Sequence, residues 1–75
     1  MEQYANLSGN SAVIAFQIEP GAIMVQFDSG WFYLYNGTST SQANIQEMQS
    51  LARAGRGLNS FIVRVVKKGY ARKWR

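Results

Sequence analysis

Three short segments in the first half of the chain have strand-like alternation and are separated by tight-turn sequences. They span residues 12–18, 22–27 and 31–36. Pro20-Gly21 occupies the central positions of a type II turn, where Pro fixes the first φ and Gly supplies the positive φ of the second. Gly30 closes a second turn in the left-handed conformation. The pattern predicts a three-stranded antiparallel meander.

Apolar residues occur on both faces of the third predicted strand. One face of this strand carries Trp31, Tyr33 and Tyr35, and the other carries Phe32 and Leu34. In the first strand, one face collects Ala12, Ile14, Phe16 and Ile18. A sheet that is apolar on both faces is either covered on two sides or offers one face to another molecule.

Two helical segments follow the predicted strands. Residues 42–54 have apolar residues at helical spacing, and Gly55 ends the pattern. The second segment, Leu58 to Lys67, contains β-branched residues that favour a strand. Its apolar residues nevertheless lie at i, i+3, i+4, i+7 and i+8, which places them on one helical face. We therefore expect a helix, with Gly69 as its left-handed cap residue.

The two ends of the chain have weaker patterns. Residues 1–11 are polar, without sustained periodicity, and predict a loose N-terminal leader. Residues 70–75 alternate and form a candidate fourth strand at the sheet edge. With 75 residues in all, the chain has room for one core, so residues 12–75 are expected to form a single domain. The fold class expected is α+β: a meander packed with two helices.

The absence of two residue types excludes much chemistry. The chain contains neither Cys nor His, which removes disulfides, thiol nucleophiles, Ser-His-Asp catalysis and Cys- or His-ligated metals. The four carboxylates are far apart in sequence, so we expect no enzyme, no cofactor and no metal site. No apolar run is long enough to span a membrane, and the first residues lack the features of a signal peptide. The expected location is therefore cytoplasmic.

Charge is unevenly distributed along the chain. Residues 1–50 hold all four acidic residues and no Lys or Arg, for a formal charge of −4. Residues 51–75 hold all eight basic residues and no acid, for a formal charge of +8. A field of one sign attracts a partner of the opposite sign, so this asymmetry indicates an anionic partner such as a nucleic acid.

An ordered set of short motifs resembles the KTSC domain, a small domain of bacterial and phage proteins that also occurs at the C-terminus of some lysyl-tRNA synthetases. The matching positions are Asn10, Ile14-Ala15-Phe16, Ile23, Val25, Phe27, Gly30, Tyr33-Leu34-Tyr35, Gly55, Leu58, Asn59, Ile62, Tyr70, Arg72 and Lys73. Two positions depart from the family pattern: Gly37-Thr38-Ser39 replaces the usual Val-Pro, and Leu34 replaces a polar residue. The resemblance implies no established activity, although RNA binding has been proposed for the family.

The charge and aromatic patterns favour a small, non-catalytic domain that binds nucleic acid, RNA more than DNA. The candidate binding residues combine cations with stacking groups: Arg64, Lys67, Lys68, Tyr70, Arg72, Lys73, Trp74 and Arg75. Trp31, Tyr33 and Tyr35 are further candidates for stacking on bases. The alternative for these three is a structural role, with Tyr33 and Tyr35 in the core and Trp31 at its rim.

A second function remains open from the sequence. Phe32 and Leu34 are candidates for a protein interface, either with another protein or with a second copy of this chain. Basic side chains clustered on one face would favour nucleic-acid binding. An uncovered apolar sheet face would favour the protein interface.

Overall fold

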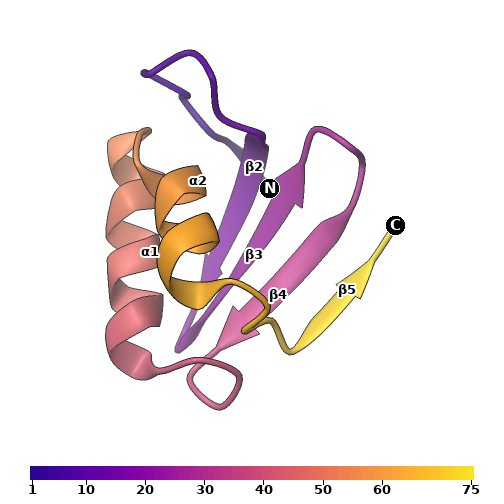
Figure 1. Ribbon diagram of the computed structural model, residues 1–75, viewed down its shortest axis with the longest axis vertical. Coiled ribbons are helices and arrows are strands. Elements are labelled where there is room, and N and C mark those ends of the chain that lie inside the picture. The colour runs from indigo at the N-terminus through magenta and orange to yellow at the C-terminus, as the bar shows by residue number, and fades with distance from the viewer.

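The computed structural model describes residues 1–75 as a five-stranded antiparallel sheet with helices on one face (Figure 1). Its elements are β1 (Glu2–Gln3), β2 (Val13–Glu19), β3 (Ala22–Phe27), β4 (Phe32–Asn36), α1 (Gln42–Ala54), α2 (Leu58–Phe61), the π-helix η1 (Ile62–Val66) and β5 (Arg72–Trp74). The strands lie in chain order across the sheet. The α+β class is confirmed, and the sheet has more strands than the three or four expected.

The predicted meander is present as β2, β3 and β4. Gly21 has φ 68° and Gly30 has φ 91°, so both turns use glycine in the left-handed region. Across the first hairpin Ile18 pairs with Ile23, and across the second Val25 pairs with Tyr33. The turn residues therefore set the register that brings these apolar side chains to the helix-covered face.

The N-terminal segment is held to the fold, so the expectation of a loose leader is wrong at residues 2–4. Glu2 and Gln3 form β1 and pair with β2. Tyr4 is buried, its amide donates to the carbonyl of Ile14 at 2.9 Å, and its hydroxyl accepts a hydrogen bond from the amide of Leu58 at 3.3 Å. A single aromatic anchor has no periodicity, so the sequence pattern does not indicate this strand.

The alternation expected in β2 is interrupted by a bulge. The register with β3 shifts between Val13 and Ala15, which adds one residue to β2. Val13 and Phe16 both lie in the core, although they are three positions apart. Ile14 is 42% exposed. The expectation that Ile14 shares a buried face with Phe16 is therefore wrong.

Helix α1 has the predicted bounds. Ser41 caps its start by accepting a hydrogen bond from the amide of Asn44 at 3.1 Å. Gly55 ends it at φ 79°, with its amide bonded to carbonyls of the last turn. Ile45 and Met48 are buried beneath the helix, against the sheet.

The second helical segment is confirmed as helical, but its second half is a π-helix. The amide of Lys67 donates to the carbonyl of Ile62, five residues earlier, at 2.6 Å. The wider turn leaves Val65 48% exposed, whereas the α-helical pattern placed it on the buried face. Lys67 has φ 50° and Gly69 does not have a positive φ, so the expected glycine cap is also wrong.

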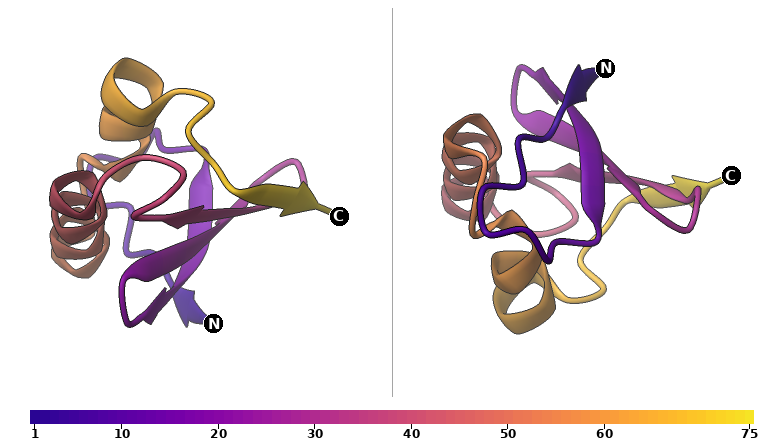
Figure 2. Two further views of the ribbon diagram at one scale, coloured as in Figure 1. Left: turned by 90° about the horizontal axis from the view of Figure 1, so that it is seen from below. Right: turned by 90° about the horizontal axis from the view of Figure 1, so that it is seen from above.

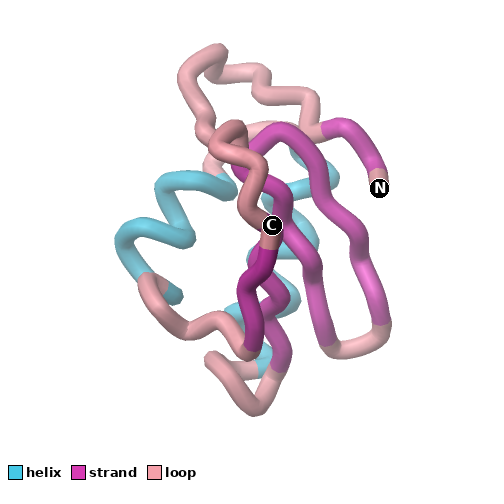
Figure 3. The backbone as a smooth tube through the Cα atoms, turned by 90° about the vertical axis from the view of Figure 1, so that its right-hand side faces the viewer, coloured by secondary structure: helices cyan, strands magenta, loops and turns pink.

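The fold has two layers. The helices lie on one side of the sheet, and β5 projects beyond them (Figure 2). The same separation of strands and helices is visible in Figure 3. The core between the layers contains Tyr4, Val13, Phe16, Ile23, Val25, Tyr35, Ile45, Met48, Ala52, Leu58, Ile62 and Val66. No helix combines the length and apolar character that crossing a membrane requires.

Candidate nucleic-acid interface

The sheet face without helices, here called the outer face, has an aromatic pair at its C-terminal edge. Phe32 of β4 and Trp74 of β5 are cross-strand partners, and their rings stack with centroids 5.7 Å apart and planes inclined by 11°. Arg72 Cζ lies 5.6 Å from the centroid of the Trp74 ring. Arg72 also pairs with Leu34 across the strands. The outer face therefore places a cation beside an aromatic stack.

The helix-facing side of the same edge repeats this combination. Lys73 Nζ lies 5.3 Å from the centroid of the Trp31 ring and 5.7 Å from that of Tyr70. Arg75 Cζ lies 5.2 Å from the Trp31 centroid. Because side chains alternate along a strand, Arg72 lies on one face of β5 and Lys73 on the other. Both faces of β5 therefore carry a cation beside an aromatic ring. We call this set the β5 strip: Trp31, Phe32, Arg72, Lys73, Trp74 and Arg75.

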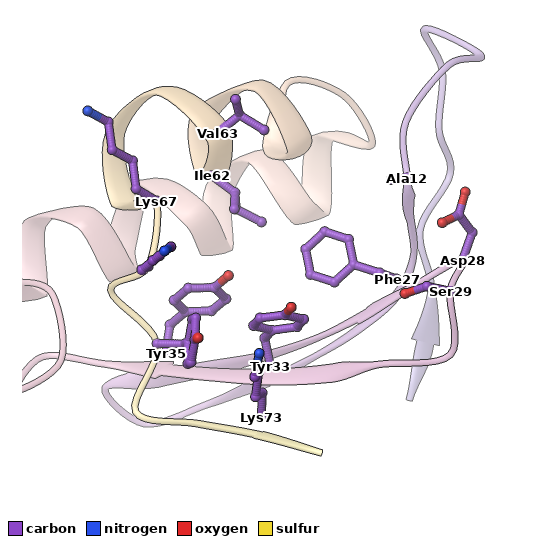
Figure 4. Close-up of a pocket in the computed structure, with 12 residues that line it drawn as sticks. Ala12, Phe27, Asp28, Ser29, Tyr33, Tyr35, Ile62, Val63, Lys67 and Lys73 are labelled. Carbon is purple, nitrogen blue, oxygen red and sulfur yellow. The ribbon is translucent and has the colours of Figure 1, made fainter. Parts of the chain in front are cut away.

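A pocket of about 430 Å³ lies between η1 and the sheet (Figure 4). We call it the tyrosine pocket because Tyr33, Tyr35 and Tyr70 line it. Three lysines also line it: Lys67, Lys68 and Lys73. Lys73 therefore belongs both to the pocket and to the β5 strip.

The three tyrosine rings pack against one another. Tyr33 and Tyr35 are stacked at 6.4 Å, and Tyr70 meets them edge-on at 4.9 Å and 6.4 Å. Tyr35 is 1% exposed, and this burial raises the pKa of its hydroxyl well above the ordinary value. Charge on Tyr33 or Tyr70 would raise it further. Tyr35 is thus a core residue, while Tyr33 and Tyr70 are half-buried beside it.

The structure divides the residues that the sequence grouped as one site. The four residues from Arg72 to Arg75 join Trp31 on the β5 strip. Lys67, Lys68 and Tyr70 line the tyrosine pocket instead. Arg64 is exposed on η1 and belongs to neither group. The cluster therefore presents two neighbouring surfaces that share Lys73.

Some members of these surfaces are not evident from the sequence. The sequence indicates only a protein interface for Phe32, whereas in the structure Phe32 is the stacking partner of Trp74. Ile62 and Val63 line the pocket, but helical spacing indicates only which residues face inward. Strand alternation alone does not pair Phe32 with Trp74, because this pairing requires the register between β4 and β5. That register depends on where the chain returns after η1.

The chain matches no protein-family model, and comparisons with curated proteins and with solved structures give no match. The resemblance to the KTSC domain therefore stays a prediction based on the residues alone. No group of three Asp or Glu side chains lies together in a way that would hold a metal ion.

Proposed function

We propose that this protein is a non-catalytic domain that binds single-stranded RNA through the β5 strip. The observation that supports this function best is the position of Arg72, Lys73 and Arg75, each of which lies over an aromatic ring. Single-strand binding needs cations for the phosphates and exposed rings for the bases. On the β5 strip, Trp74 lies between Lys73 and Arg75 in sequence, and the rings of Trp31 and Phe32 lie beside them at the start of β4.

The surroundings of the strip support the same function. β5 is an edge strand and projects beyond the helices, so a flexible polymer can approach it from both faces (Figure 2). It also ends the segment of formal charge +8. The preference for RNA over DNA, and the cytoplasmic location included in the proposal, rest on the resemblance to the KTSC domain and on the sequence alone.

The salt dependence of binding tests the proposal. The protein is titrated with single-stranded and duplex RNA at several salt concentrations. For a single strand, log K should fall with log salt by about 0.7 per phosphate contact. Replacing Arg72 and Lys73 together with Gln should reduce the magnitude of this slope by about 1.4, because two contacts are lost.

A matched control comes from two cations at the end of α1. Replacing Arg53 and Arg56 with Gln removes the same charge away from the β5 strip and should leave the slope nearly unchanged. Exposed charges contribute little stability, so both double variants should remain folded. Absence of strand binding at low salt, or equal slope changes in the two variants, would reject the proposed function.

A protein interface is a second candidate because the outer face has no helix over it (Figure 2). Phe32, Leu34 and Met24 lie side by side there across β4 and β3, and each is only half-buried. An apolar sheet face of this kind is suited to a second protein or to a second copy of the chain. Sedimentation decides on self-association: a concentration-dependent increase in mass supports it, and a monomer at high concentration rejects it.

A further inference from the structure

The tyrosine pocket lies between an apolar helix wall and an aromatic sheet wall. Ile62 of η1 points toward the sheet and forms one wall, and Tyr33 and Tyr35 rise from β4 to form the opposite wall (Figure 4). Its volume of about 430 Å³ falls within the range of about 300 to 1,000 Å³ that small-ligand sites occupy. Phe27 and Tyr33, which are only half-buried, also line it. An aromatic ring inserted between the walls would cover apolar surface that solvent now reaches.

The basic and acidic side chains that line the pocket lie on different sides of it. Lys67, Lys68 and Lys73 line the pocket, with the Lys67 ammonium directed away from the tyrosines (Figure 4). The only carboxylate among the lining residues is that of Asp28, on the opposite side from Lys67. The backbone of Lys67 has φ 50° and ψ −115°, a conformation that non-glycine residues rarely adopt. The i to i+5 bond from its amide to Ile62 accompanies this geometry. Residues in such rarely adopted backbone conformations are common at functional sites.

The hydroxyl groups of the pocket are free to bind a ligand. The hydroxyl of Tyr4 is engaged with Leu58, whereas those of Tyr33, Tyr35 and Tyr70 have no hydrogen-bond partner in the chain. No side-chain oxygen is both fully buried and unpartnered. The Tyr35 hydroxyl is therefore reachable from the pocket although the residue as a whole is buried. These groups can donate to ring nitrogens, carbonyls or phosphate oxygens.

We propose that the tyrosine pocket binds one nucleotide, with the base between the η1 wall and the tyrosines and the phosphate at the lysines. Asp28 can accept a hydrogen bond from an N–H group of the base. The inference rests on the proposed function, because the nucleotide would be one unit of the strand that the β5 strip holds. Lys73, which belongs to both surfaces, would link the two contacts.

Mononucleotides test the pocket separately from strand binding. The full chain is titrated with each ribonucleoside 5′-monophosphate, with the matching nucleoside and with inorganic phosphate, and chemical-shift changes are recorded by NMR. The changes should map to Tyr33, Tyr35 and Ile62. Monophosphates should bind about tenfold or more tightly than nucleosides, because the phosphate adds charge-assisted hydrogen bonds to the lysines.

Two variants with the same charge change separate the surfaces. Lys68→Gln should weaken monophosphate binding several-fold and leave nucleoside binding unchanged. Arg72→Gln, on the outer face, should leave both unchanged while it weakens strand binding. Equal affinity for monophosphates and nucleosides, or shift changes confined to Phe32 and Trp74, would overturn the pocket assignment.

The two proposals fail in distinguishable ways. If strands bind with the expected salt dependence but mononucleotides do not bind, the pocket inference is wrong and the proposed function is unaffected. If mononucleotides bind at the pocket while strands do not bind at all, the proposed function is wrong and the pocket assignment holds for the free nucleotide. Strands with and without a terminal phosphate then show whether a strand end or an internal nucleotide occupies the pocket.

Discussion

Phe32 and Trp74 stack across the β4–β5 pair, with ring centroids 5.7 Å apart and planes inclined by 11°. β5 has only three residues, and an edge strand this short gains little from its own backbone hydrogen bonds. The stack, together with the hydrogen bond from the amide of Ala71 to the carbonyl of Leu34 at 2.6 Å, holds it to the sheet. The same pair thus supports the edge strand and forms part of the proposed RNA surface.

Replacing Trp74 with Ala should weaken binding of single-stranded RNA by about 1 to 3 kcal/mol, the value of one base stack. The salt slope should stay nearly the same, because stacking releases no counterions. Trp74→Phe keeps a ring against Phe32 and should retain most of the affinity. Isothermal titration at several salt concentrations measures both quantities. Unchanged affinity in Trp74→Ala would exclude the ring from the interface.

The Tyr4 hydroxyl should contribute to stability through its contact with the start of α2. Tyr4→Phe leaves the buried amide of Leu58 without its acceptor, which should lower the free energy of unfolding by about 1 kcal/mol or more. Tyr33→Phe removes a hydroxyl without a partner and should change stability little. Urea denaturation of the two variants makes the comparison. Similar losses in both would show that the Tyr4 contact contributes nothing specific.

Gly55 and Gly30 should respond differently to replacement by Ala. Both have positive φ, at 79° and 91°, so each substitution should cost about 1 to 2 kcal/mol of backbone strain. A Cβ at position 55 would also lie 2.7 Å from the Cβ of Ala5, whereas one at position 30 meets open space. We expect a further loss of about 1 to 3 kcal/mol for Gly55→Ala, measured by chemical denaturation. Equal losses would contradict close packing of the N-terminal segment on α1.

Alkaline pH should destabilise the fold through Tyr35. Burial raises the folded-state pKa of Tyr35 above its unfolded value of about 10. Its contribution to stability is therefore complete below pH 10 and is lost as pH rises toward the folded-state pKa, because only the unfolded chain releases the proton readily. Between about pH 10 and 11, the free energy of unfolding should fall more steeply in the natural chain than in Tyr35→Phe. Parallel pH profiles of the two proteins would refute this.

Local sequence was sufficient for α1 and for the turns. Ser41 and Gly55 specify the two ends of α1 through contacts within a few residues, which explains why its predicted bounds match the structure. Pro20 and Gly21 specify a turn in the same way. The tyrosine face of β4 was also correctly recognised as an alternating strand face. These features depend on spacing and backbone preference, and both are visible in sequence.

The candidate site could be predicted only in part. The sequence showed which residues supply charge and stacking in the C-terminal segment. It did not show that Arg72 and Lys73 lie on opposite faces of β5 or that Lys67 and Lys68 line a pocket. The latter depends on the π-helical turn of η1, where a wider hydrogen-bonding pattern redirects the chain after Val66. Pairing of β5 with β4 then determines which ring each cation meets.

Sequence alone determined the α+β class, the meander, the bounds of α1 and the concentration of positive charge after residue 50, because each follows from local preference or from composition. Tertiary structure decided the pairing of β1, the bulge in β2, the π-helical form of η1 and the separation of the basic residues into a strip and a pocket. These features depend on packing between segments far apart in the chain. Tyr4 is an example, because it contacts Phe16 and Leu58. Neither contact can be inferred from the local sequence pattern of residues 1–11.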